Sequence, residues 1–235
     1  MSSTTKPKPS GRSVPALVAG ERLNQKTFHE RYVLMPENVK AELVEGIVYM
    51  AALALKLAHG GRHSKINYWL ESYCEKTPGT DAFDNVTAIL GEESEPQPDA
   101  ILMVLPDHGG RSRVSKDGYC DGAPELTVEV SLSTESVDRN AKLRDYQRAG
   151  VMEYLIVLVQ REQIIWYSRP DATRDFVELK PDQHGIFKSN FFGGLWLDPI
   201  ALFAGDRPAL RATLKRGFAS PEHAAFVKSL ARRKK

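Results

Sequence analysis

The segment that most constrains the fold is a strand, a helix and a second strand within residues 126–159. Leu126–Ser131 is predicted to be a strand, and residues 138–149 a helix that Gly150 ends. Residues 153–159 are apolar enough to form a buried central strand. Two strands joined by one helix over so short a distance favour neighbouring parallel strands in one sheet. The chain is therefore predicted to be an α/β protein.

Other elements follow from local periodicity and from glycine and proline positions. Residues 41–50 are predicted to form a hairpin around the turn Glu45-Gly46. An apolar stripe at helical spacing predicts a helix that Pro78-Gly79 ends; it consists of Ile66, Trp69, Leu70 and Tyr73. Further strands are predicted over 85–90, 99–105 and 163–168, and further helices over 28–34 (capped by Thr27), 199–204, 207–217 and 221–233.

The composition is that of an ordinary globular chain, with 42% hydrophobic and 26% charged residues among 235. Fibrous, collagen-like and wholly disordered chains are excluded on this ground. No apolar run approaches the ~18 residues of a membrane span, and the polar N-terminus does not resemble a secretory signal. Cys74 and Cys120 lie far apart and outside any CxxC pair. We therefore expect a reduced, cytoplasmic protein without a disulfide framework.

Charge is segregated along the chain, although the formal net charge is only +2. Residues 207–235 carry nine Lys or Arg and one acid, Glu222, whereas residues 1–13 carry three basic residues and no acid. We expect a disordered, basic N-terminal tail over 1–20, one acidic domain over 21–206 and a basic helical extension over 207–235. Basic ends of this kind either contact a phosphate backbone or serve only to keep a protein soluble.

Two carboxylates on predicted strands are candidate cation ligands. Asp99 opens the strand in QPDAILMV, although Asp is a poor strand former. Glu129 lies in TVEVS, where alternation places it on one face with Thr127 and Ser131. If the two strands are neighbours, both carboxylates can share one divalent cation, and carboxylates with water oxygens suit Mg²⁺. The alternative is a turn residue at position 99 and a solvated strand face at position 129.

The helix after the Glu129 strand contributes a third candidate. Lys142 lies 13 residues after Glu129, so its long side chain can reach back toward the strand. Tyr146 shares its helix face, while Asp138 suits a cap at the helix start. Without a partner, Lys142 would be an ordinary exposed lysine.

The motif HGGRH contains two histidines at a spacing that resembles zinc ligands. The glycine pair Gly60-Gly61 disfavours a helix, and the glutamate of HExxH is absent, so zinc is not expected. His63 is either a substrate contact or a residue at a helix start. We assign His63 and Tyr146 as substrate contacts.

The order of these motifs resembles the Uma-two family of restriction endonuclease-like proteins, within the PD-(D/E)XK nuclease superfamily. The motifs are PD, TVEVS, DxxxKxxxY, GVMEYLIV and GLWLDP, preceded by the hairpin AELVEGIVYM and by HGGRH. No single motif is specific, but the ordered set is. The resemblance covers residues 25–206 and leaves both tails out.

The resemblance implies a restriction-endonuclease-like core with a central mixed β-sheet flanked by helices. By position, Asp99 is the acid of PD, Glu129 is the acid of (D/E)XK, and Glu42 of the hairpin is an accessory ligand. These three side chains would hold Mg²⁺ or Mn²⁺. The sequence departs from the pattern at Ser131, which stands where the superfamily has lysine. Lys142 resembles a migrated equivalent and completes the catalytic set.

The function implied is hydrolysis of DNA phosphodiester bonds by a metal-dependent endonuclease, with the basic tails adding phosphate contacts. One alternative is an inactive nuclease fold that binds nucleic acid or a protein, because a fold alone does not establish activity. Another is a dimerising scaffold with GLWLDP at its interface. Binding of Mg²⁺ through Asp99 and Glu129 separates the nuclease from these alternatives. Cleavage of both strands of a duplex would favour a homodimer.

Overall fold

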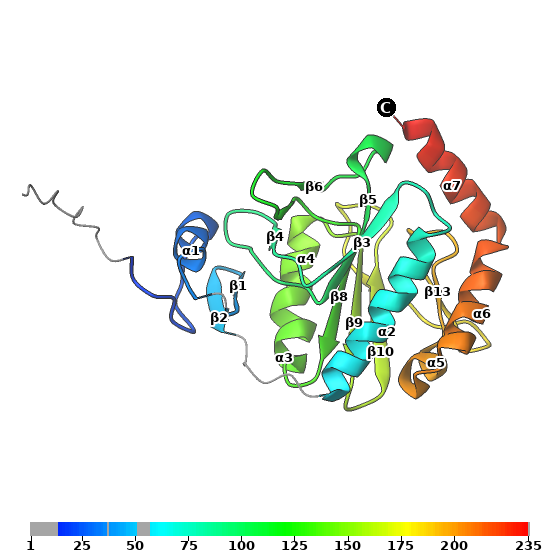
Figure 1. Ribbon diagram of the computed structural model, residues 1–235, viewed down its shortest axis with the longest axis horizontal. Coiled ribbons are helices and arrows are strands. Elements are labelled where there is room, and N and C mark those ends of the chain that lie inside the picture. The colour runs from blue at the N-terminus through cyan, green and yellow to red at the C-terminus, as the bar shows by residue number, and fades with distance from the viewer. Residues whose placement is uncertain (1–13, 37, 51–56, 235) are drawn as a thin grey trace, which may run out of the picture.

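The computed structural model describes residues 14–36, 38–50 and 57–234, with the backbone alone for 57–59. Within these residues a six-stranded mixed sheet forms the centre, and helices cover both of its faces (Figure 1). Across the sheet the order is β11 (Val177–Glu178), β10 (Gln163–Ser168), β9 (Glu153–Leu158), β8 (Leu126–Ser131), β5 (Ala100–Val104) and β3 (Thr80–Asp84). Strands β8 and β9 are parallel, and each other neighbouring pair in this sheet is antiparallel. The predicted mixed α/β architecture is confirmed.

The strand–helix–strand unit lies in the middle of the sheet. Its connection consists of α3 (Glu135–Val137), a π-helical turn η2 (Asp138–Lys142) and α4 (Leu143–Ala149). Gly150 ends α4 in the left-handed conformation, with φ of 101°, and its N–H donates to the carbonyls of Tyr146 and Gln147. Strands β8 and β9 are buried along their whole length. Burial on both faces agrees with the apolar sequence of β9, which the sequence predicts to be a buried central strand.

Helix α2 (Leu57–Cys74) covers the face of the sheet opposite α4 (Figure 1). Ile66, Trp69, Leu70 and Tyr73 are fully buried, and they join one core cluster with side chains of β5 and β8. Their spacing therefore predicts the buried face of the helix correctly. The pair Gly60-Gly61 lies inside this helix, so the expectation that it disfavours a helix is wrong. The stability of α2 comes from the packing of its later turns, which outweighs the low helix propensity of glycine.

An N-terminal subdomain consists of α1 (Gln25–Tyr32), β1 (Ala41–Val44) and β2 (Ile47–Met50). The turn residues Glu45 and Gly46 both have positive φ, as a two-residue hairpin turn requires. The helix begins earlier than the predicted 28–34, because Asn24 rather than Thr27 caps it. The Asn24 side chain accepts a hydrogen bond of 2.8 Å from the Thr27 N–H.

Backbone contacts tie this subdomain to the segment before β5. Leu43 and Glu95 exchange two backbone hydrogen bonds of 3.1 and 2.8 Å. Residues 14–20, which the sequence groups with the N-terminal tail, lie against the hairpin: Leu17 is buried, and the Gly20 N–H donates to the Val48 carbonyl. The rest of the predicted tail, residues 1–13, lies outside the described residues.

The helices predicted over 199–204, 207–217 and 221–233 are confirmed as α5 (Pro199–Ala204), α6 (Arg207–Phe218) and α7 (Pro221–Arg233). Each helix begins at a side-chain cap, provided by Asp198, Asp206 and Ser220 in turn. Leu210, Leu214 and Leu230 are fully buried in the same cluster as α2. These helices are therefore part of the main core: α5 and α6 contact α2, and α7 contacts α6 and η1 (Pro106–His108) (Figure 1).

The remaining elements are short. They are β4 (Ala88–Ile89), β6 (Arg113–Val114), β7 (Cys120–Asp121), the 3₁₀ helix η1 (Pro106–His108), β12 (Phe187–Lys188) and β13 (Trp196–Leu197). The strand predicted over 85–90 is replaced by β3 and β4, because Asn85 takes a positive φ of 49° and separates them. None of the described helices combines the length and apolar character that crossing a membrane demands.

Candidate active site

The register of the sheet brings the two predicted strand acids together. Strand β5 runs antiparallel to β8 with Ala100 opposite Val128, so the preceding residue, Asp99, falls opposite Glu129. The Oδ2 atom of Asp99 accepts a hydrogen bond of 2.7 Å from the Val130 N–H. Glu129 is only 4% exposed. The prediction that these two strands are neighbours is confirmed.

Lys142 reaches back from the helix to this pair of strands. Its Nζ atom donates to Oε1 of Glu129 and to Oε1 of Glu42, each at 2.9 Å. The Lys142 side chain is 6% exposed, so the exposed-lysine alternative is wrong. Glu42 comes from β1 of the hairpin, and the same Oε1 also accepts the Gln97 N–H at 2.7 Å. One ammonium thus connects the hairpin to the central strand.

Tyr146 lies one helical turn beyond Lys142 and contacts the same carboxylate. Its hydroxyl donates to Glu129 Oε1 at 2.7 Å, and its ring packs edge-on against Tyr154. The side chain is fully buried, and the assignment of Tyr146 as a substrate contact stays a prediction. Its hydroxyl is engaged by the Glu129 carboxylate in this structure.

His63 lies beside the first acid of the pattern. Its Nε2 atom is 2.6 Å from the Asp99 carbonyl oxygen and 2.7 Å from Asp84 Oδ1. The His63 side chain is 12% exposed, so it lies close to the surface of the molecule. Its assignment as a substrate contact stays a prediction.

The cluster contains more acidic than basic side chains. Burial raises the pKa of Glu129 well above its usual range; Lys142 opposes this rise, while Asp138, Asp99 and Glu42 add to it. Burial lowers the pKa of Lys142, but Glu129, Glu42 and Asp138 outweigh that effect and hold its pKa well above the usual value. Lys142 therefore remains protonated, and three acidic side chains, Glu129, Glu42 and Asp138, surround one buried ammonium.

Residues 26–200 match the family Uma2, which is described as "Putative restriction endonuclease". The match spans more than half of the chain and includes Glu42, Asp99, Glu129 and Lys142. The chain belongs to the Uma2 family. None of the curated proteins matches it.

A solved structure shares the fold of this Uma2 protein. It is described as a "putative nuclease belonging to DUF820 from Anabaena variabilis ATCC 29413". The TM-score is 0.55 at 16% sequence identity, and the likeness covers 74% of this chain and 96% of that chain. At this identity the likeness concerns the fold alone, and it confirms the nuclease-like core that the motifs predict.

The site of this Uma2 protein includes one residue that the sequence assigns only to a helix cap. Asp138 is 1% exposed, and its Oδ1 atom lies 3.9 Å from Lys142 Nζ. Its Oδ2 atom accepts the Thr134 hydroxyl at 2.6 Å. Asp, Lys and Tyr spaced by four residues in DxxxKxxxY share one helix face, and this spacing is the signal that could have placed Asp138 in the cluster.

The donor set of the cluster fits a divalent cation. Carboxylate oxygens are the ligands that Mg²⁺ and Mn²⁺ prefer, and Glu129, Glu42 and Asp138 lie around the same ammonium. A buried oxygen, Asp138 Oδ1, also has no hydrogen-bond partner. Among the described residues, no three His, Cys, Asp or Glu side chains are already grouped to hold a metal ion. In this arrangement the Lys142 ammonium joins two of the carboxylates that the sequence analysis predicts to be metal ligands.

Proposed function

We propose that this protein is a divalent-cation-dependent endonuclease that hydrolyses DNA phosphodiester bonds. The observation that supports this most is the buried contact of Lys142 with Glu129, made across two elements that the sequence separates by 13 residues. Burial of a charged lysine costs desolvation free energy, so a buried lysine in a carboxylate cluster indicates a functional or structural role. Membership of the Uma2 family supports a role in nuclease chemistry.

Each residue of the site has a proposed role in the reaction. Asp99, Glu129 and Glu42 would hold Mg²⁺ or Mn²⁺ through carboxylate oxygens. The bound cation would polarise a phosphoryl oxygen and lower the pKa of a water molecule. Lys142 would orient that water or stabilise charge that develops on the phosphate. Tyr146 fixes Glu129 by donating to its Oε1 atom.

Two backbone groups keep the acids in place before any ligand arrives. The Val130 N–H holds Asp99 at 2.7 Å, and the Gln97 N–H holds Glu42 at 2.7 Å. Such preorganisation lowers the cost of assembling the site during the reaction. These contacts support the assignment of both acids, because they fix one oxygen of each carboxylate.

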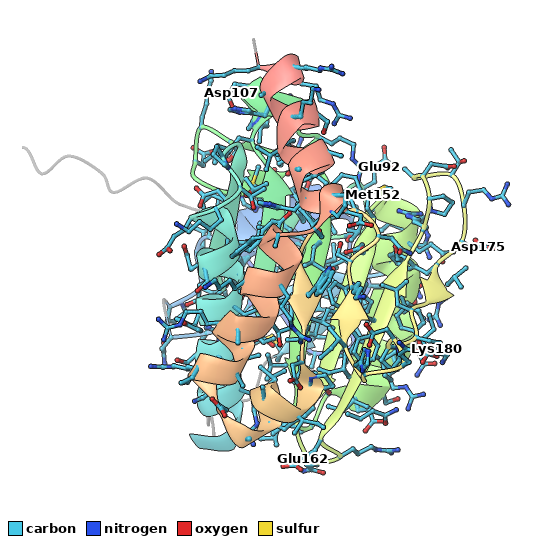
Figure 2. All side chains as sticks on the ribbon, turned by 90° about the vertical axis from the view of Figure 1, so that its right-hand side faces the viewer. Glu92, Asp107, Met152, Glu162, Asp175 and Lys180 are labelled. Carbon is cyan, nitrogen blue, oxygen red and sulfur yellow. The ribbon has the colours of Figure 1, made fainter. Side chains whose placement is uncertain are left out.

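Exposed basic side chains offer a surface for the phosphate backbone. On α6 and α7 they are Arg207, Arg211, Lys215, Arg216, Lys228, Arg232 and Arg233, followed by Lys234. Within the described part of the chain none of these eight forms an ion pair, and Figure 2 looks onto the helices that carry them. Val128 and Val130 pack on the core that includes these helices, so Glu129, which alternates with them, faces away. We infer that this surface binds nucleic acid at a distance from the cleaved bond.

The proposed function is tested by metal binding and cleavage together. Mg²⁺ should raise the melting temperature of the wild-type protein by mass action, and the protein should nick supercoiled DNA in Mg²⁺ but not in EDTA. Asp99→Asn keeps an oxygen that can accept the Val130 N–H, so the variant should fold yet lose both responses. Asp117→Asn, at an exposed position on a loop, is the matched control and should retain them.

Two results would contradict this proposal. Absence of a wild-type response to both Mg²⁺ and Mn²⁺ would favour an inactive fold that binds a partner. An undiminished response in Asp99→Asn would place the metal elsewhere. The expected homodimer is a separate prediction, which light scattering of the purified protein checks.

A further inference from the structure

Asp138 is a buried carboxylate whose two oxygens are in unequal situations. Oδ2 accepts the Thr134 hydroxyl at 2.6 Å, whereas Oδ1 is buried and has no hydrogen-bond partner. A buried oxygen of this kind is costly, so its retention calls for an explanation. The nearest cation is Lys142 Nζ, which lies 3.9 Å from Oδ1.

The ammonium of Lys142 has three protons, and two of them are engaged. They are donated to Glu129 and Glu42, the acids that would bind a divalent cation. A cation on those oxygens would repel the ammonium and take away both of its acceptors. Lys142 would then be a buried charge without a partner, which costs several kcal/mol unless a new acceptor is at hand.

We propose that Asp138 is an alternative hydrogen-bond acceptor for the Lys142 ammonium, which shifts from Glu129 and Glu42 to Asp138 Oδ1 when a divalent cation binds. The proposal rests on the proposed function, because it concerns the same site. Asp138 is then a positioning residue, which keeps Lys142 charged and next to the reacting groups. The shift is small, since closing the distance by about 1 Å makes a hydrogen bond.

The position of Asp138 as this alternative acceptor is already fixed. The Thr134 hydroxyl holds one side of the carboxylate, and the Tyr154 hydroxyl donates to the Asp138 backbone carbonyl at 3.0 Å. Asp138 and Lys142 are the first and last residues of the π-helical turn η2, and such turns are frequent at functional sites. Because both residues belong to one turn, the lysine can change partners without movement of another element.

A double-mutant cycle on metal affinity tests the proposal. Calorimetry with Mg²⁺ or Mn²⁺ alone is carried out on the wild type, Asp138→Asn, Lys142→Met and the double variant. Asn can still accept the Thr134 hydroxyl, and Met keeps the apolar stem of lysine, so all four proteins should fold, which their melting temperatures without metal check. Glu135→Gln, which removes a charge from the more exposed start of α3, is the matched control.

The proposal predicts that Asp138→Asn has a large effect on metal affinity only when Lys142 is present. Asp138→Asn should weaken metal binding at least tenfold with Lys142 in place, and less than threefold in the Lys142→Met background, while Glu135→Gln should change it less than twofold. Equal losses in both backgrounds would overturn the proposal and make Asp138 a metal ligand. No loss in either would overturn it as well. A wild type that binds neither metal would refute the proposed function and this inference together.

Discussion

Asp145 shows how burial acts on a single carboxylate outside the cluster. Burial raises its pKa to about 6, and the hydrogen bond of 2.6 Å from the Ser94 hydroxyl only partly offsets that rise. The residue is 3% exposed, so little water screens it. Because its folded pKa exceeds the unfolded value of about 3.9, ionisation of Asp145 opposes folding. The free energy of unfolding therefore falls as the pH rises from about 4 to about 6, and the loss persists above that range.

Replacing this carboxylate should remove its share of the pH dependence. Asp145→Asn can still accept the Ser94 hydroxyl, so at pH 8 it should raise the free energy of unfolding by about 2–3 kcal/mol more than at pH 4. Urea denaturation at the two pH values measures this difference. Asp117→Asn, at an exposed position, should show none. The same effect of Asp145→Asn at both pH values would show that burial does not control this group.

Single residues also show where prediction from the sequence succeeds and fails. The pairing of Asp99, Glu129 and Lys142 is predictable, because strand alternation and helix position both depend on nearby residues. Asp138 is missed, since a cap and a buried partner of a lysine can occupy the same position in a helix. Burial of Tyr146 is missed as well, because it depends on packing against Tyr154 on another strand.

At the scale of elements, local signals predict the hairpin, the strand–helix–strand unit and the C-terminal helices. Each has its own turn or cap, such as Gly150 after α4 and Asp206 before α6. The π-helical turn η2 is not predictable in this way, because its residues have ordinary helical composition. Strand β3 is missed because its sequence, TDAFD, has weak strand propensity and is held by pairing with β5.

Two glycines in helices should respond in opposite directions to the same substitution. In α6, Gly217 leaves no room for a Cβ atom beside the carbonyl of Gly194, so Gly217→Ala should destabilise the protein by about 1–3 kcal/mol. In α2, Gly60 has open space beside it, so Gly60→Ala should stabilise the protein by about 0.5–1 kcal/mol. Thermal denaturation of both variants measures the two shifts. Shifts of the same sign would contradict the close docking of α6.

For the molecule as a whole, the basic residues at the C-terminal end of the sequence lie on folded helices. The basic C-terminal segment is packed on the core through Leu210, Leu214 and Leu230, so it is not a tail that can be deleted without harm. Its role in binding is better tested by removing charges from its exposed face. The overall charge pattern is readable in the sequence, but the placement of this face on the opposite side of the sheet from Glu129 depends on the fold.

A triple variant on this face should weaken binding of DNA and its dependence on salt. The changes are Arg211→Gln, Lys215→Gln and Lys228→Gln, measured against a control of Lys26→Gln, Lys116→Gln and Arg174→Gln, which are exposed elsewhere. In EDTA, the slope of log affinity against log salt should become shallower by about 0.9 for each phosphate that the variant no longer neutralises. The control should keep the wild-type slope. Equal slopes for all three proteins would mean that the basic helices only contribute solubility.

Cleavage of supercoiled DNA by Lys142→Met is the most direct test of the account. Lys142 is the only described Lys or Arg that forms an ion pair with both Glu42 and Glu129, and Met preserves the apolar stem while removing the charge. In Mg²⁺ the variant should bind DNA like the wild type but nick it at least about 100-fold more slowly, in line with the loss of one electrostatic stabiliser. Nicking at the wild-type rate would show that the buried lysine does not act in catalysis and that the cluster is structural.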